Sequence, residues 1–261
     1  LIESIKKTKL SSNDPTKIIF ESLANNIEKI LSKREKILID TSKNNPKIII
    51  FVGVNGSGKT TTIGMMLGLL KPSDGEILID GKKIEKNRIE ILQKINFISP
   101  YIELPKKLTV KQNLIVYGKL YNVKNLKRKI EYLIDKLRLS ELLNTLTGEL
   151  SSGQKNRVSL AKALINDPIV LLLDEPTASL DPEIGDYVRT FLEDYKKEKN
   201  ISILLASHNM NEVTRLCKSI LMMKEGVIID KGNPEELIKK HGRQNLEEVF
   251  LKLSRSKDEF N

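Results

Sequence analysis

Apolar residues along this chain gather into short, nearly unbroken runs separated by polar stretches. Residues 48–52, 169–173 and 201–206 form such runs, and each is rich in Ile, Leu or Val. A short run that is apolar on both faces is typical of a parallel strand buried inside a sheet. Residues 219–223 and 227–230 flank Glu225-Gly226 and predict a hairpin late in the chain.

Between these runs the apolar positions change to a helical spacing of three and four residues. Helical patterns cover residues 111–145 and 155–166, and a last one starts at Pro234. We therefore expect an α/β fold with a mainly parallel sheet flanked by helices. A further helix is expected near the N-terminus, after Asp14-Pro15, and its apolar positions are Ile19, Leu23, Ile27, Ile30 and Leu31.

A polar break at residues 41–46 divides the chain into two expected parts. Residues 1–45 form the helical N-terminal segment, and residues 46–261 form one α/β domain. A length of 261 residues suits one large domain with such an appendage. Hydrophobic residues make up 39% and charged residues 30% of the chain, which is enough apolar material for a packed core.

The single cysteine, Cys217, excludes an intrachain disulfide and fits a reducing compartment. No apolar run is long enough to span a bilayer. The formal charge is +10, and residues 1–64 hold 11 Lys and Arg against 6 Asp and Glu. A basic segment suits anionic lipid or RNA, but a solvated face of a lysine-rich chain explains it as well. We expect no nucleic-acid partner.

Glycines dominate the stretch after the first predicted strand. Residues 53–60 read Gly-Val-Asn-Gly-Ser-Gly-Lys-Thr and fit the phosphate-binding pattern G-x-x-x-x-G-K-[ST], between a strand and a helix. Glycine lets backbone N–H groups turn toward phosphate oxygens, and the lysine brings a cation to the β- and γ-phosphates. A glycine-rich turn without a ligand would rarely keep Gly-Lys-Thr in register there. The predicted nucleotide-binding residues are Gly53, Asn55, Gly56, Ser57, Gly58, Lys59, Thr60 and Thr61.

A second set of motifs follows in the last two thirds of the chain. Leu-Ser-Ser-Gly-Gln at residues 150–154 precedes a predicted helix, and Leu-Leu-Asp-Glu-Pro-Thr at 172–177 ends a predicted strand. Ala-Ser-Leu-Asp at 178–181 comes next, and His208 follows the strand at 201–206. From about Met65 to the end, roughly three quarters of the chain, the sequence resembles the ATP-binding subunits of ABC transporters.

This resemblance implies a P-loop ATPase that uses ATP and Mg²⁺. Thr60 and Asp174 would hold Mg²⁺, and Glu175 would act as general base on the attacking water. His208 would contact the γ-phosphate and steady that water. A helical subdomain, at about residues 96–166, would carry the motif at 150–154.

The resemblance also implies a dimer. Ser151, Ser152, Gly153 and Gln154 would close over the nucleotide of a second copy, although Ser152 stands where that family usually has glycine. Ser179 and Asp181 would link the two sites across the dimer. The expected partners are a second copy of the chain, arranged head to tail, and a membrane permease. Residues 104–114 resemble exporter subunits, which favours export. As a partner of a permease, the chain is expected on the cytoplasmic face of the cell membrane.

The chain departs from that family in two places. The family carries a Gln near residues 95–100, and this chain has none there. The family also begins with strands that bear an adenine-stacking aromatic residue, which residues 1–47 lack. Residues 1–64 instead resemble the N-domain and phosphate loop of signal-recognition-particle receptor GTPases, as if two families joined near residue 65.

Two alternatives therefore stay open. One is a targeting GTPase of that class, which residues 1–64 favour, although no Thr-Lys-x-Asp motif follows to select guanine. The other is a hybrid that folds incompletely and has neither activity.

Overall fold

The computed structural model describes residues 48–53, 56–99, 102–177, 180–207, 209–217 and 219–255. The predicted N-terminal helix, with the rest of residues 1–47, lies outside the described residues. Asn55, Ser179 and His208 lie outside them as well.

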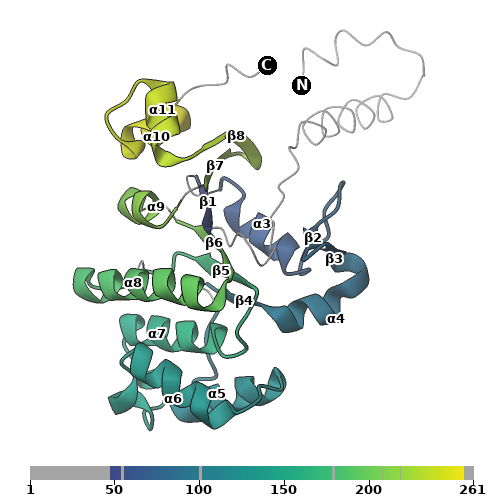
Figure 1. The fold of residues 1–261 in the computed structure, drawn as a ribbon, viewed down its shortest axis with the longest axis vertical. Helices are drawn as coiled ribbons and strands as arrows, with labels where there is room; N and C mark the ends of the chain where they lie inside the picture. The colour runs from purple at the N-terminus through teal and green to yellow at the C-terminus, as the bar shows by residue number, and fades with distance from the viewer. Residues whose placement is uncertain are drawn as a thin grey trace, which may run out of the picture. The chain divides into compact units, whose positions relative to one another are not determined.

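A six-stranded sheet, in the order β4-β5-β6-β1-β7-β8, forms the centre of the described part of the chain (Figure 1). The neighbouring pairs β4–β5, β5–β6, β6–β1 and β1–β7 are parallel, and only β7–β8 is antiparallel. The strands are β1 (Ile48–Val52), β4 (Ile95–Ile98), β5 (Val170–Asp174), β6 (Ser202–Ala206), β7 (Ser219–Lys224) and β8 (Val227–Gly232). This confirms the predicted mainly parallel sheet and the late hairpin.

Helices connect the strands and cover them. Between β1 and β5 the described helices are α3 (Lys59–Met66), α4 (Ile84–Lys94), α5 (Val110–Leu120), α6 (Leu126–Lys136) and α7 (Ser152–Ala163). After β5 they are α8 (Pro182–Lys199), α9 (Met210–Leu216), α10 (Pro234–His241) and α11 (Leu246–Arg255). Figure 1 shows α5, α6 and α7 grouped together below α8. Among the described residues, no helix combines the length and the apolar character needed to cross a membrane.

Residues 78–79 form β2 (Leu78–Ile79), which pairs with β3 (Lys82–Lys83) in a separate two-stranded sheet. Residues 95–98, which overlap the start of the helical subdomain expected at about residues 96–166, form strand β4 of the main sheet. Helices α5 and α6 contact each other, and α5 contacts α7.

The register of the sheet brings three loops to one edge. Phe51 of β1 and Asp174 of β5 both lie beside Ala206 of β6. In a parallel sheet the loops that leave the carboxyl ends of such strands meet at the same edge, where ligands of open α/β folds bind. The phosphate loop, the residues after Asp174 and the residues after Ala206 are therefore neighbours.

Candidate nucleotide-binding site

The phosphate loop closes tightly between β1 and α3, and glycine is required at two of its positions. A Cβ added to Gly53 would lie 2.3 Å from Oγ of Ser57 and 2.5 Å from the carbonyl oxygen of Met223. Gly58 precedes α3 with φ of 95°, in the left-handed region that side chains disfavour. The glycines of the motif are therefore needed for the path of the backbone.

Lys59 opens α3 and is buried against its own loop. Its Nζ donates a 2.5 Å hydrogen bond to the carbonyl oxygen of Gly53 and lies 3.4 Å from Oγ of Ser57. Burial lowers the pKa of Lys59, and the negative charges of Glu175 and Asp174 act against that effect. The loop thus holds an ammonium group close to two carboxylates. Thr61 is exposed in the first turn of the same helix.

Asp174 ends β5 as a buried carboxyl group, 4% exposed. Its Oδ2 accepts hydrogen bonds of 3.4 Å from Oγ1 of Thr60 and of 3.4 Å from Oγ of Ser99. Burial raises the pKa of Asp174, and the negative charge of Glu175 raises it further. The hydrogen bond from Ser99 is the largest of the effects that lower this pKa. Two hydroxyls and a carboxylate from three separate elements thus converge on one point.

Ser99 is a site residue that the sequence-based prediction missed. It follows β4 directly, in the segment where the resemblance led us to look for a Gln. Ile98 is the register partner of Leu173, so Ser99 lies beside Asp174 across the two strands. Its position after a strand of the parallel sheet is the signal that would have identified it, but that strand was not predicted.

The three oxygen atoms suit a hard divalent cation. Mg²⁺ prefers oxygen ligands and keeps water and phosphate oxygens in its shell, so a few protein oxygens are enough. Within the described residues no group of three or more His, Cys, Asp or Glu residues is placed to hold a metal by itself. The donor set of Thr60, Ser99 and Asp174 fits Mg²⁺ that arrives with a nucleotide.

Glu175 follows Asp174 with an unusual backbone conformation. Its φ is 50°, in the left-handed region, and its N–H donates a 2.8 Å hydrogen bond to the carbonyl oxygen of Ala206. A left-handed non-glycine residue costs about 1–3 kcal/mol, and such residues cluster at functional sites. The side chain is half-buried at the edge where the three loops meet. His208, which the sequence also places at this edge, is outside the described residues.

The motif at residues 151–154 builds the beginning of α7. The Ser151 side chain accepts a hydrogen bond from the N–H of Gln154 at 3.2 Å, and Oε1 of Gln154 accepts one from the N–H of Ser151 at 2.9 Å. This capping box occupies both side chains and leaves Ser152 exposed. α7 contacts β4, which is separated from β1 by β5 and β6. The pattern Ser-x-x-Gln, visible in the sequence, is the signal for this cap.

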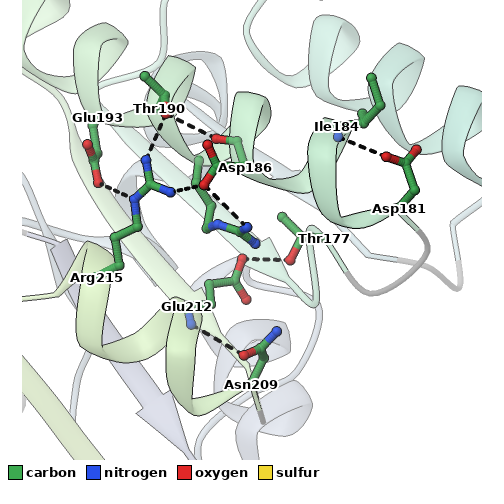
Figure 2. Close-up of polar contacts among 10 residues, drawn as sticks. Thr177, Asp181, Ile184, Asp186, Thr190, Glu193, Asn209, Glu212 and Arg215 are labelled. Carbon is green, nitrogen blue, oxygen red and sulfur yellow. Dashed lines mark hydrogen bonds and ion pairs between the residues drawn. The ribbon is translucent and has the colours of Figure 1, made fainter.

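Asp181 has a similar local role at the beginning of α8. Its Oδ1 accepts a 3.0 Å hydrogen bond from the N–H of Ile184 (Figure 2). Pro182 occupies the first helical position. The carboxyl group is exposed at the surface.

Comparison with known proteins identifies the family. A family model described as "ABC transporter" matches residues 39–178. The chain is 35% identical over 208 residues to the ABC transporter ATP-binding protein NatA of Bacillus subtilis. The aligned region covers 78% of this chain and 84% of NatA. It is 39% identical over 196 residues to the Nod factor export ATP-binding protein I of Rhizobium johnstonii, covering 72% of this chain and 60% of that protein.

A solved structure agrees with this assignment. The dimeric structure of MJ0796, described as a bacterial ABC transporter cassette, matches with a TM-score of 0.67 at 25% identity, over 72% of this chain and 85% of that one.

The family match begins at residue 39 and includes the phosphate loop, so it extends further toward the N-terminus than the motifs alone indicated. These comparisons give no support to the resemblance of residues 1–64 to signal-recognition-particle receptor GTPases. The chain belongs to the ABC transporter family, as an ATP-binding subunit that hydrolyses ATP.

Proposed function

We propose that two copies of this chain enclose ATP and Mg²⁺ between them in a head-to-tail dimer, and that hydrolysis drives a membrane permease in the direction of export. The phosphate loop at 53–60 of one copy and the turn at 151–154 of the other face the same nucleotide.

The observation that carries this proposal is the convergence of Thr60 and Ser99 on Oδ2 of Asp174, at 3.4 Å each. These residues would hold Mg²⁺ beside the phosphate loop. When bound, the cation neutralises charge on the phosphate oxygens. Lys59 lies next to this cluster, so a triphosphate placed there meets the ammonium group and the N–H groups of the loop together.

The carboxylate of Glu175 is proposed as the general base. It accepts a proton from the attacking water, and the hydrogen bond from its N–H to Ala206 holds its backbone in place during that step. His208 is proposed to contact the γ-phosphate, and Ser179 and Asp181 to link the two sites. The exposed first turn of α7 in a second copy is proposed to supply N–H donors for the γ-phosphate.

An experiment on Glu175 tests this mechanism. Glu175→Gln keeps the size of the side chain and removes the base, so ATP still binds while turnover falls by about 10²–10⁴-fold. With Mg²⁺ and ATP, the variant accumulates as a dimer in size-exclusion chromatography. Glu131→Gln, at an exposed position of α6, is the matched control and hydrolyses ATP at the unaltered rate. Full turnover by Glu175→Gln would remove Glu175 as the base, and a monomer under these conditions would refute the dimer.

The permease and the membrane location need a different experiment. Export is supported by the similarity to the Nod factor export protein and by the exporter-like residues 104–114. We expect the chain to purify with a multi-span membrane protein encoded by a neighbouring gene, and to lie on the cytoplasmic face of the cell membrane through that partner. Transport into inside-out vesicles with ATP outside demonstrates export, and loss of substrate from the vesicles would contradict it.

Two competing proposals concern the N-terminal residues. A GTPase of the signal-recognition-particle class rests on residues 1–64 alone, and competition between ATP and GTP for the site separates it from an ATPase. An incompletely folded hybrid would show no cooperative unfolding, and no shift of the unfolding midpoint with ATP. We propose residues 1–45 as a separate helical segment, so a chain that begins at residue 46 should keep ATP-dependent stabilisation.

A further inference from the structure

Glu212 is a buried acidic residue to which the reaction described above assigns no part. It lies in α9 and is 1% exposed. Each of its carboxyl oxygens accepts one hydrogen bond from a hydroxyl group, Oε1 from Thr177 at 2.9 Å and Oε2 from Ser207 at 2.7 Å. Figure 2 shows the Thr177 contact within the wider polar network of α8 and α9.

The two hydroxyl partners come from the two loops that carry the proposed catalytic groups. Thr177 is two residues beyond Glu175, and Ser207 immediately precedes His208 in the sequence. The strands before these loops are parallel neighbours, and the N–H of Glu175 already binds the carbonyl oxygen of Ala206. The Glu212 carboxyl group joins the same two loops at a second point, through side chains.

The position of Glu212 is set from its own loop as well. The N–H of Glu212 donates a 3.3 Å hydrogen bond to Oδ1 of Asn209, and the N–H of Asn209 donates a 3.1 Å hydrogen bond to Oγ of Ser207. The residues on both sides of His208 are therefore tied to Glu212. A carboxyl group with both oxygens hydrogen-bonded in a buried place holds its partners in one geometry, because any alternative leaves a buried polar atom unsatisfied.

We propose that Glu212 is a positioning residue for ATP hydrolysis, which holds the loop after Glu175 and the loop around His208 at a fixed separation. The inference rests on the proposed function, because the roles of Glu175 and His208 are assigned there. In this role Glu212 acts on the reaction only through the two loops that it joins. Its loss acts through the alignment of the two loops, and small misplacements of catalytic groups reduce rates strongly.

Three substitutions test the proposal in the full-length chain. Glu212→Gln keeps the shape but offers one oxygen and one NH₂ group in place of two acceptors. Thr177→Val keeps the shape and removes one donor. We expect kcat to fall about tenfold in each, with KM for ATP within about twofold of the original value. Because both side chains belong to the one hydrogen-bonded cluster that joins the two loops, the double variant should lose less than the product of the two single effects. Glu193→Gln, which removes a charge that lies 3.5 Å from Arg215 in the same network, should leave kcat unchanged.

The outcomes separate this inference from the proposed function. If Glu175→Gln stops turnover while Glu212→Gln and Thr177→Val keep kcat within twofold and only lower the unfolding midpoint, Glu212 is a structural residue and the inference is wrong. If Glu175→Gln retains turnover, Glu175 is not the base, and the part of the proposed function on which this inference rests fails. Multiplicative losses in the double variant would also contradict the inference, because they would mean that the two side chains act independently.

Discussion

Oγ of Ser99 donates a 3.4 Å hydrogen bond to Oδ2 of Asp174, across the neighbouring strands β4 and β5. The same oxygen of Asp174 accepts the hydroxyl group of Thr60. Ser99 is therefore the residue that this chain supplies to the proposed metal-binding cluster, in the segment where ABC subunits usually have a Gln. The side chain of serine is shorter than that of glutamine. Ser99 reaches Oδ2 of Asp174 because it directly follows β4, the strand next to β5.

Replacement of Ser99 tests this role. Ser99→Ala removes one oxygen and one of the hydrogen bonds that lower the pKa of Asp174. We expect the apparent affinity for Mg²⁺ to fall about tenfold, a loss typical of residues that support a metal site. The measurement is ATPase activity against Mg²⁺ concentration at saturating ATP. Ser140→Ala, at an exposed position, is the control, and an equal Mg²⁺ dependence in both variants would exclude Ser99 from the site.

The close approach at Gly53 predicts a second effect. Gly53→Ala places a Cβ 2.5 Å from the backbone oxygen of Met223. Met223 lies in β7, so this oxygen can move away only if the hairpin of β7 and β8 moves with it. We expect a loss of about 1–3 kcal/mol in the free energy of unfolding and weaker ATP binding. Gly185→Ala, where the nearest atom is a guanidinium nitrogen at 3.4 Å, should be neutral or stabilising by about 0.5–1 kcal/mol. Urea unfolding measures both, and an equal effect in both variants would contradict the steric argument.

The capping box of α7 predicts a stability effect coupled to activity. Ser151→Ala removes the cap and should lower the free energy of unfolding by about 1 kcal/mol. Asn233→Ala removes the corresponding cap of α10, with a similar loss of stability. Only Ser151→Ala should also lower ATPase activity, because α7 is the helix proposed to face the second nucleotide. If Ser151→Ala and Asn233→Ala have the same stability and the same ATPase activity, the proposed contact of α7 with the second nucleotide is wrong.

Helix α10 is attached to the sheet through Asp230 of β8, which is 8% exposed. Its carboxyl group contacts Nζ of Lys240 and Nε2 of His241, at 2.6 Å each. Burial alone would raise the pKa of Asp230, but the hydrogen bonds from Lys240 and His241 outweigh it and hold the pKa below its usual value.

This lowered pKa fixes the sign of a pH effect. A folded-state pKa below the unfolded value of about 4 stabilises the fold above that pH, and the stabilisation is lost as the pH falls through the folded pKa. Asp230→Asn should therefore lower stability by about 2 kcal/mol at pH 7, and by progressively less toward pH 3. Urea midpoints across this range measure the difference. Asp135→Asn, at an exposed position of α6, should have the stability of the original chain at every pH. A loss of stability in Asp230→Asn that is the same at pH 7 and pH 3 would contradict the lowered pKa of Asp230.

Much of the sheet followed from local patterns. The run at residues 48–52 forms β1 within the predicted bounds, because a strand buried on both faces must be apolar at every position. The strand β4 was not predicted, because Asn96 interrupts its apolar residues and α4 leads into it without a break. Without β4, nothing in the sequence pointed to Ser99.

The sequence by itself determined the phosphate loop, the carboxylates at residues 174–175 and the motif at 151–154, because each is a local pattern whose backbone chemistry requires those residue types. Only the tertiary structure decided which side chains meet. Ser99 reaches Asp174 from 75 residues away, and Glu212 joins Thr177 from 35 residues away. Such contacts depend on the order and register of parallel strands, which no local stretch of sequence encodes.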